Sequence, residues 1–205
     1  MNIIRIHCSD EAVAASPPDL FGLMADVERF SIEVPSEVAN VLGAGAPVFV
    51  GVSGGRDSQA LAYRVCAHLD DIGHQGRRFL IHADLGRVDW RDSLPVCERL
   101  AHRLGVELVV VRRNAGDMMD RWLSRWAANV ARYANLECVK LILPWSTAAQ
   151  RFCTAELKSQ VIAREMRRRF PEGDVVSAVG IRREESAKRA PRGRACRPGS
   201  RTSAR

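Results

Sequence analysis

The residues best suited to chemistry lie in one short segment, Ser53-Gly54-Gly55-Arg56-Asp57-Ser58. It follows the apolar run Val48–Val52 and precedes an apolar helical pattern, so we expect a buried strand, a glycine turn and a helix in succession. Glycine lets a backbone approach an anion closely, and the free amides of a helix N-terminus attract phosphate. The two serines add hydroxyl donors, the arginine adds a permanent positive charge, and the aspartate is either a helix cap or a Mg²⁺ ligand. The segment therefore predicts a cradle for phosphate or pyrophosphate.

Strands and helices alternate along most of the chain. The pattern predicts strands at 48–52, 79–81, 107–111 and 175–179, and helices at 57–72, 94–104, 116–133 and 156–169. This alternation is typical of an α/β fold with a parallel sheet. Right-handed crossovers place the C-terminal ends of the strands at one edge, where such sheets bind ligands. The segments that begin at His82 and Gly180 also follow strands, so we expect them beside the glycine loop.

The glycine loop matches neither the Walker A pattern nor the dinucleotide GxGxxG pattern. It resembles the SGGxDS pyrophosphate loop of the PP-loop ATP pyrophosphatases, the adenine nucleotide alpha hydrolases. Within that superfamily the chain resembles the phosphoadenosine phosphosulfate (PAPS) reductase-like family. Besides the loop, the matching segments are His82-Ala83-Asp84-Leu85-Gly86, Arg151-Phe152-Cys153-Thr154 with Leu157-Lys158, and Gly180-Ile181-Arg182-Arg183-Glu184-Glu185-Ser186. The four segments occur in the family's order and cover about residues 47–190.

The resemblance implies a HUP-type, Rossmann-like parallel sheet with helices on both faces, and ATP or a sulfonucleotide (PAPS or adenosine phosphosulfate) along its C-terminal edge. It assigns cofactor binding to Ser53, Gly54, Gly55, Arg56, Asp57, Ser58, His82, Ala83, Asp84 and Arg151. It assigns catalysis to Asp57, Lys158 and Arg182, with Asp57 and Asp84 as candidate Mg²⁺ ligands and no iron–sulfur cluster. Three separated cations, Arg151, Lys158 and Arg182, suit a polyanionic ligand. Arg56 stands where many relatives carry lysine.

The individual residues also have simpler interpretations. Arg151 and Lys158 fit a solvated helix surface, Asp84 fits a helix cap, and His82 fits packing at a strand end. The chain lacks the glutamate-cysteine-glycine motif with which PAPS reductases carry their nucleophile, and it passes instead into a tail of Arg, Pro and Gly. In place of the usual C-terminal segment we therefore expect only this tail.

Three functions remain open at this stage. The first is an adenylating enzyme that cleaves ATP between the α- and β-phosphates, releases pyrophosphate and activates an acceptor of unknown identity. The second is a thiol-dependent sulfonucleotide reductase, for which Cys153 is the candidate nucleophile, beside cations that would lower its pKa. The third is a truncated, non-catalytic nucleotide-binding subunit. A homodimer is compatible with all three.

Composition places the protein in a broad class. Seven of the 31 Lys and Arg residues lie in 187–205, and the remaining 24 equal the 24 acidic residues, so the domain itself is not a basic nucleic-acid binder. The tail at 191–205 is predicted to be disordered, and nucleic acid would bind only through it. No apolar run approaches the roughly 20 residues that span a bilayer, and no secretory signal is evident, so we expect a cytoplasmic protein without membrane contact.

The remaining expectations concern domain organisation and the core. Residues 1–46 are expected to form a helical lead-in, with helices at 20–30 and 37–42, followed by the nucleotide-binding domain at 47–190. The helix at 116–133 carries an apolar stripe at helical spacing, which we interpret as core rather than as a base-stacking platform. The stripe consists of Met119, Trp122, Leu123, Trp126 and Val130. Six scattered cysteines with no CxxC pair indicate neither a disulfide scaffold nor a common zinc site, and Cys66 and Cys97 fit buried thiols.

Overall fold

The computed structural model describes residues 3–8, 34–145, 147, 152–180 and 195–196, with side chains from residue 34 to residue 180. Its elements are β1 (Ile3–Cys8), α1 (Ser36–Gly43), β2 (Val48–Val52), α2 (Arg56–Asp71), β3 (Arg78–Asp84), η2 (Gly86–Val88), α3 (Ser93–Leu104), β4 (Glu107–Arg112), α4 (Met118–Ala134), α5 (Phe152–Thr154), η3 (Ala155–Ser159), α6 (Gln160–Arg169), β5 (Val175–Gly180) and β6 (Ala195–Cys196). The four predicted strands and the predicted helices at 37–42, 57–72, 94–104, 116–133 and 156–169 are present, within a few residues of their predicted bounds. Among the described helices, none has the length and apolarity that crossing a membrane requires.

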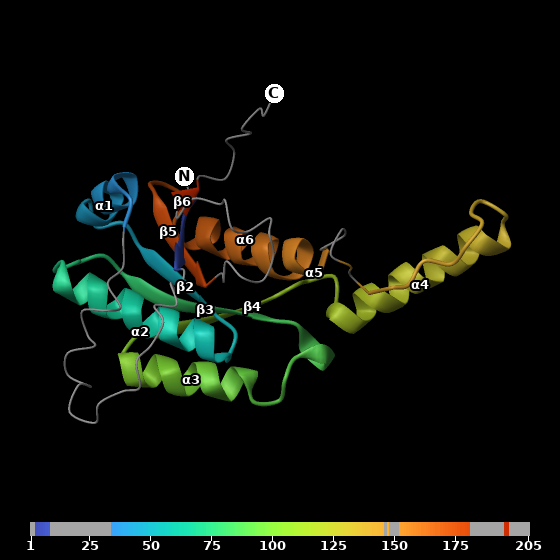
Figure 1. Ribbon diagram of the computed structural model, residues 1–205, viewed down its shortest axis with the longest axis horizontal. Helices are drawn as coiled ribbons and strands as arrows, with labels where there is room; N and C mark the ends of the chain where they lie inside the picture. Colours follow the sequence, from blue (N-terminus) through green and yellow to red (C-terminus); the bar gives the residue numbers. More distant parts are fainter. Residues whose placement is uncertain (1–2, 9–33, 146, 148–151, 181–194, 197–205) are drawn as a thin grey trace, which may run out of the picture.

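The strands form one sheet in the order β4-β3-β2-β5-β1-β6 (Figure 1). All neighbours pair in parallel except β6, which pairs antiparallel with β1. The chain moves outward from β2 to β3 and β4 on one side, and β5 then pairs with the other side of β2. The order therefore reverses at β2, and in such sheets the crevice beyond the strand ends at this switch point is the usual ligand site. The fold is α/β and Rossmann-like.

Helices cover both faces of the sheet (Figure 1). On one face α1, α2 and α3 bury Val50 and Val52 of β2 together with Leu80 of β3. On the other face α6 packs against a cluster that includes Phe49 and Phe79, whose rings stack with their centroids 4.6 Å apart. Burial of apolar side chains contributes roughly 25 cal/mol per Å². Because β2 and β3 bury apolar side chains on both faces, this contribution favours their central positions in the sheet. These two strands carry the predicted site at their ends.

Two strands at the edge of the sheet were not predicted. Residues 3–8, expected within a helical lead-in, pair in parallel with β5, for example Ile4 with Val176. Residues 195–196, expected within a disordered tail, pair with Arg5 and Ile6 of β1. Short strands at an edge depend on backbone pairing with a neighbour, which a hydrophobic period in six residues or fewer does not reveal. The predicted helix at 20–30 lies outside the described residues.

Helix α4 corrects the interpretation of the apolar stripe as core. The helix extends away from the sheet (Figure 1), and Leu123, Trp126 and Val130 are 57%, 37% and 42% exposed. Met118 and Asn129 are the residues of α4 that are buried. A helical period shows that one face of a helix is apolar, but it does not show which surface covers that face.

Candidate functional site

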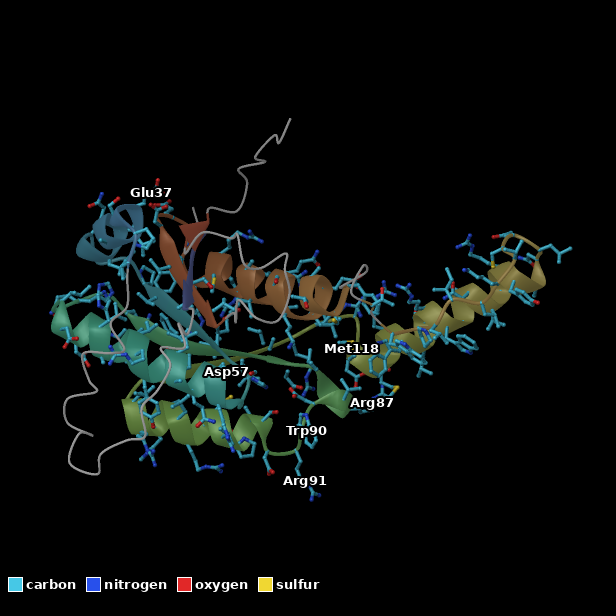
Figure 2. The ribbon with its side chains drawn as sticks, viewed as in Figure 1. Glu37, Asp57, Arg87, Trp90, Arg91 and Met118 are labelled. Atoms are coloured by element: carbon cyan, nitrogen blue, oxygen red, sulfur yellow. The ribbon has the colours of Figure 1, made fainter. Side chains whose placement is uncertain are left out.

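The glycine loop lies where the strand order reverses. β2 ends at Val52, α2 begins at Arg56, and Gly55 is the N-cap residue, with no side chain bonded to the amides of the first turn. Ser53, Gly55, Arg56 and Asp57 are all exposed. The first N–H groups of a helix lack partners within the helix and carry its positive dipole end. Asp57 is therefore not the N-cap, as one prediction had it, but a first-turn residue facing solvent (Figure 2).

Ser58 and Gln59 fix the shape of this loop from within. The Ser58 hydroxyl donates to the Gly55 carbonyl oxygen at 2.9 Å and accepts from the Ser53 amide at 3.2 Å. The Gln59 side chain donates to the Gly54 carbonyl oxygen at 3.1 Å. Ser58 is buried, so its hydroxyl braces the loop, whereas Ser53 is the exposed hydroxyl of the pair. A loop held in this way keeps its amides in place before a ligand arrives.

The two glycines of the loop have different roles. Gly54 has a φ of +77°, and a Cβ there would lie 2.8 Å from the Cα atom of Ser93 at the start of α3. Gly55 has an ordinary extended backbone, and a Cβ there would come no closer than 3.6 Å to another part of the chain. Gly54 is thus required for folding the loop. Gly55 needs no special φ, and its missing side chain leaves open space at the helix N-terminus.

The glycine loop packs against a group of mostly buried side chains, which are His82, Asp89 and Cys97. The His82 ring is 3% exposed, with Nδ1 3.1 Å from the Val52 carbonyl oxygen and Nε2 3.4 Å from Asp89 Oδ2. Burial raises the pKa of the Cys97 thiol, toward which the Gly54 amide donates. His82 therefore packs at the strand end, the simpler of its two predicted roles, and Ala83 beside it is buried as well. Direct contact of either residue with a ligand stays a prediction.

Asp84 ends β3 in an ion pair. Its carboxylate accepts from the Gly86 amide at 2.6 Å and from the Arg112 guanidinium of the neighbouring strand. Burial acts to raise the pKa of Asp84, but the bonds from Arg112 and Gly86 outweigh it and hold that pKa below its ordinary value. The residue remains an anion, as a metal ligand must, but its oxygens already have partners. Asp57 is the more accessible of the two candidate Mg²⁺ ligands. Within the described ranges no three metal-ligating side chains cluster.

Sequence analysis missed Trp90 and Arg91, which follow η2 at the same end of the sheet as Asp57 (Figure 2). Trp90 is 85% exposed, and its amide donates to the Asp89 carboxylate at 3.1 Å. The other oxygen of that carboxylate faces His82, which in turn lies against the end of β2. Asp89 therefore links Trp90 to the residues that pack beneath the glycine loop. An exposed aromatic ring next to a phosphate cradle offers a stacking surface for a base. The signal available in the sequence was the proximity of Trp90 to the HADLG segment.

The N-terminal end of α4 is bonded to the loop that follows β3. Arg87 binds the Asp117 carboxylate through Nε at 2.7 Å and through a second guanidinium nitrogen at 2.9 Å, and it also pairs with Asp120. The Met118 amide donates to the Leu85 carbonyl oxygen at 3.2 Å. The loop after β3 and the start of α4 are therefore joined by both backbone and side-chain bonds.

Lys158 lies on the π-helical turn η3, which contacts β3. It is half-buried, and within the described part of the chain no ion pair reaches its amine. The neighbouring Glu156 binds Arg121 of α4 at 2.8 Å, and this bond lowers the pKa of Glu156 against the effect of burial. Single π turns inside helices are frequent at functional sites. The other two predicted cations, Arg151 and Arg182, lie outside the described residues.

The glycine loop and the loop after β3 follow neighbouring parallel strands, and the turn that carries Lys158 contacts β3. Such an edge offers free amides, a guanidinium, an amine and an exposed aromatic ring. This combination suits a ligand with a planar base and several phosphate charges. No protein-family model matches the chain, and no curated protein does either.

The first prediction separates the two glycines by their effect on stability. Gly54→Ala should lower the free energy of unfolding by about 2–3 kcal/mol, because it combines a left-handed backbone with a backbone clash. Gly55→Ala should change it by no more than about 0.5 kcal/mol. Urea unfolding followed by circular dichroism measures both. Equal losses in the two variants would contradict the distinction.

Proposed function

We propose that the protein is an adenine-nucleotide-binding enzyme of the PP-loop, PAPS reductase-like type with a HUP-type sheet. In this proposal it binds ATP at residues 53–58 and adenylates an acceptor. The observation that carries the proposal is the braced glycine loop at the switch point, whose helix N-terminus has no side-chain cap and has open space at Gly55. A pyrophosphate group needs both close backbone approach and unpaired amides.

The reaction that fits this loop is displacement at the α-phosphate. A nucleophilic oxygen of the acceptor forms a bond to the α-phosphorus, the bond to the bridging oxygen of the β-phosphate breaks, and its electron pair leaves with pyrophosphate. The chain's contribution is electrostatic: loop amides and Arg56 hold the leaving pyrophosphate, and Lys158, with Arg182 as the resemblance implies, supplies positive charge for the α-phosphate. An acceptor that is already an anion requires no general base.

Mg²⁺ suits the donor set next to the loop. This ion binds through one or two carboxylates together with phosphate oxygens and water, and the exposed Asp57 carboxylate meets that need without a dedicated cage. Asp84 would first have to exchange its Arg112 partner. When bound, Mg²⁺ neutralises phosphate charge.

Trp90 supports assignment of the base to the loop after β3. Parallel strands β2 and β3 are neighbours, so a nucleotide with its phosphates at residues 53–58 extends its base toward the end of β3. The Trp90 backbone amide is bonded there to the Asp89 carboxylate, and most of the residue's surface is exposed. Stacking on an aromatic side chain is worth about 1–3 kcal/mol per base.

The second prediction tests ATP binding through the loop. Gly55→Val should weaken ATP·Mg²⁺ binding at least about 10-fold, because its side chain fills the space open to the pyrophosphate, while the unfolding midpoint stays within a few degrees. Isothermal titration with ATP, PAPS and adenosine phosphosulfate measures the affinities. Ala60→Val on the exposed side of α2 is the matched control. Unchanged ATP affinity in folded Gly55→Val would overturn the loop assignment.

The third prediction concerns the base. Trp90→Ala should weaken ATP binding about 10-fold and remove the quenching of tryptophan fluorescence that accompanies it, whereas Trp90→Phe should retain most of the affinity. Because the two variants differ in their aromatic ring, the comparison separates stacking from general disturbance of the loop. ATP binding by Trp90→Ala with unchanged affinity would place the base elsewhere.

The fourth prediction distinguishes adenylation from thiol-dependent reduction. Adenylation releases pyrophosphate from ATP, and Cys153→Ser should leave both binding and release intact because the site consists of amides and cations. Cys153 is half-buried on α5, close in sequence to Lys158, which keeps the reductase as the second candidate. Sulfite release from PAPS with thioredoxin as electron donor, lost in Cys153→Ser, would reverse the order of the two functions.

A further inference from the structure

The protein exposes most of its large apolar side chains on one projecting feature, which consists of α4 and residues 135–145 and is called the arm here. Fourteen large apolar residues are exposed in the described part of the chain, and ten of them lie between Leu123 and Trp145. Leu136 and Val139 near the tip are 92% and 95% exposed. Figure 1 places the arm away from the sheet and its helices. An apolar patch of this size on a soluble protein marks a contact surface.

The spacing of the apolar residues on α4 identifies the shape of the missing contact. Met119, Leu123, Trp126, Val130 and Tyr133, called the seam here, follow one another at intervals of four, three, four and three residues. This is the 3.5-residue repeat with which one α-helix lies along another in a left-handed pair. The period is therefore that of a helix partner rather than of a flat sheet or an irregular surface.

The chain's own return segment covers a different face of α4. Asn129 is buried and its side chain donates to the Ile142 carbonyl oxygen at 2.9 Å, while Arg121 at the base of the helix binds Glu156. These contacts lie on the side of Trp122 and Asn129. At about 100° per helix residue, the centre of the seam is rotated from that side by about 70°, and four of its five residues remain 37–57% exposed.

Charge and side-chain size on the seam favour an identical partner. Two copies that meet about a two-fold axis place the same residues opposite one another, so a charged seam would repel itself. The seam contains no charged residue, and the arginines of α4 lie at other positions, two of them against the Phe152 ring. Ala127 and Ala134 line the side of the seam away from Asn129, where small side chains let a second helix approach closely.

We propose that the arm is a dimerisation surface, on which α4 of a second copy of this chain packs antiparallel along the seam. Paired helices lie about 8–10 Å apart, whereas each protein body is several times wider, so a parallel pair would bring the two bodies together at the arm's base. The antiparallel pair places the bodies at opposite ends of a helix about 25 Å long. It also brings each tip, with Leu136 and Val139, to the body of the other copy.

The exposed apolar area is sufficient for a stable dimer. The four exposed seam residues and the two tip residues, with roughly 100 Å² exposed on each, give on the order of 600 Å² of apolar surface per copy. A standard stable interface buries about 800 Å² per partner, of which about 65% is apolar in homodimers. A nucleic acid is disfavoured as occupant, because the seam carries no charge to pair with phosphate and the most exposed residues of the arm, Leu136 and Val139, are aliphatic. The inference stands independently of the proposed nucleotide chemistry.

The fifth prediction measures the oligomeric state of the full chain by sedimentation equilibrium. The unaltered protein should be a dimer at micromolar concentration, and the double variant Leu123→Glu/Val130→Glu should raise the dimer dissociation constant at least about 100-fold. Ser124→Glu/Ala128→Glu adds the same charge at exposed positions off the seam and should remain dimeric. An unaltered protein that is still monomeric at about 100 µM would overturn the proposal. A double variant that still dimerises like the unaltered protein would overturn it too.

A cross-linking experiment tests the orientation and needs no variant that removes the dimer. In an antiparallel pair centred on Trp126, two copies of Ala127→Cys lie about 3 Å apart along the helix axis, whereas two copies of Ala134→Cys lie about 24 Å apart. With Cys138→Ser as background, mild oxidation should therefore give a disulfide-linked dimer for Ala127→Cys alone. Cross-linking of both variants, or of neither, would contradict the antiparallel arrangement.

Discussion

The close contact between Gly54 and the backbone of Ser93 is the constraint on which the candidate site depends. It joins the turn after β2 to the start of α3, and no residue with a side chain fits there without moving one of them. Below the contact, His82 and Cys97 hold the ends of the same segments. The loop can expose Gly55 and the first amides of α2 because its opposite side is packed so tightly. Rigid support on one side and open amides on the other are two results of one packing arrangement.

The sequence predicted the elements whose signal is local. Val48–Val52 is an apolar run followed by glycines, so strand, turn and helix were all identified, and the site's loop with them. β1 was missed because Arg5 and His7 interrupt its apolar residues, and because its partner β5 lies about 170 positions further along the chain. Trp90 was missed because an exposed aromatic residue in a loop has no period. Whether Ser58 binds a ligand or braces the loop depends on hydrogen bonds that a motif does not specify.

The candidate site and the arm are joined through the loop after β3, in addition to the bond between Arg121 and Glu156. Leu85 accepts a hydrogen bond from Met118, and Arg87 binds Asp117 and Asp120 at the start of α4. The same loop continues to Asp89 and Trp90, on which the base is proposed to stack. The bonds to Arg87 hold the pKa of Asp117 far below its ordinary range, so this junction stays ionised across the neutral range. The base of the arm is therefore bonded both to the loop after β3 and, through Glu156, to the turn that carries Lys158.

The π-helical turn Ala155–Ser159 has a consequence for how this chain tolerates insertions and deletions. A π turn accommodates one more residue than an α turn does, so it behaves as a single-residue insertion within an otherwise α-helical segment. Because the wider turn absorbs that residue, the segments on its two sides stay close to the register of a regular helix. Loss of one residue from α6 near its start would instead rotate everything before it by about 100°. Glu156 would then turn away from Arg121, and Phe152 away from the guanidinium groups stacked on its ring. Loss of one residue within the π turn itself is therefore the length change that this helical segment tolerates best.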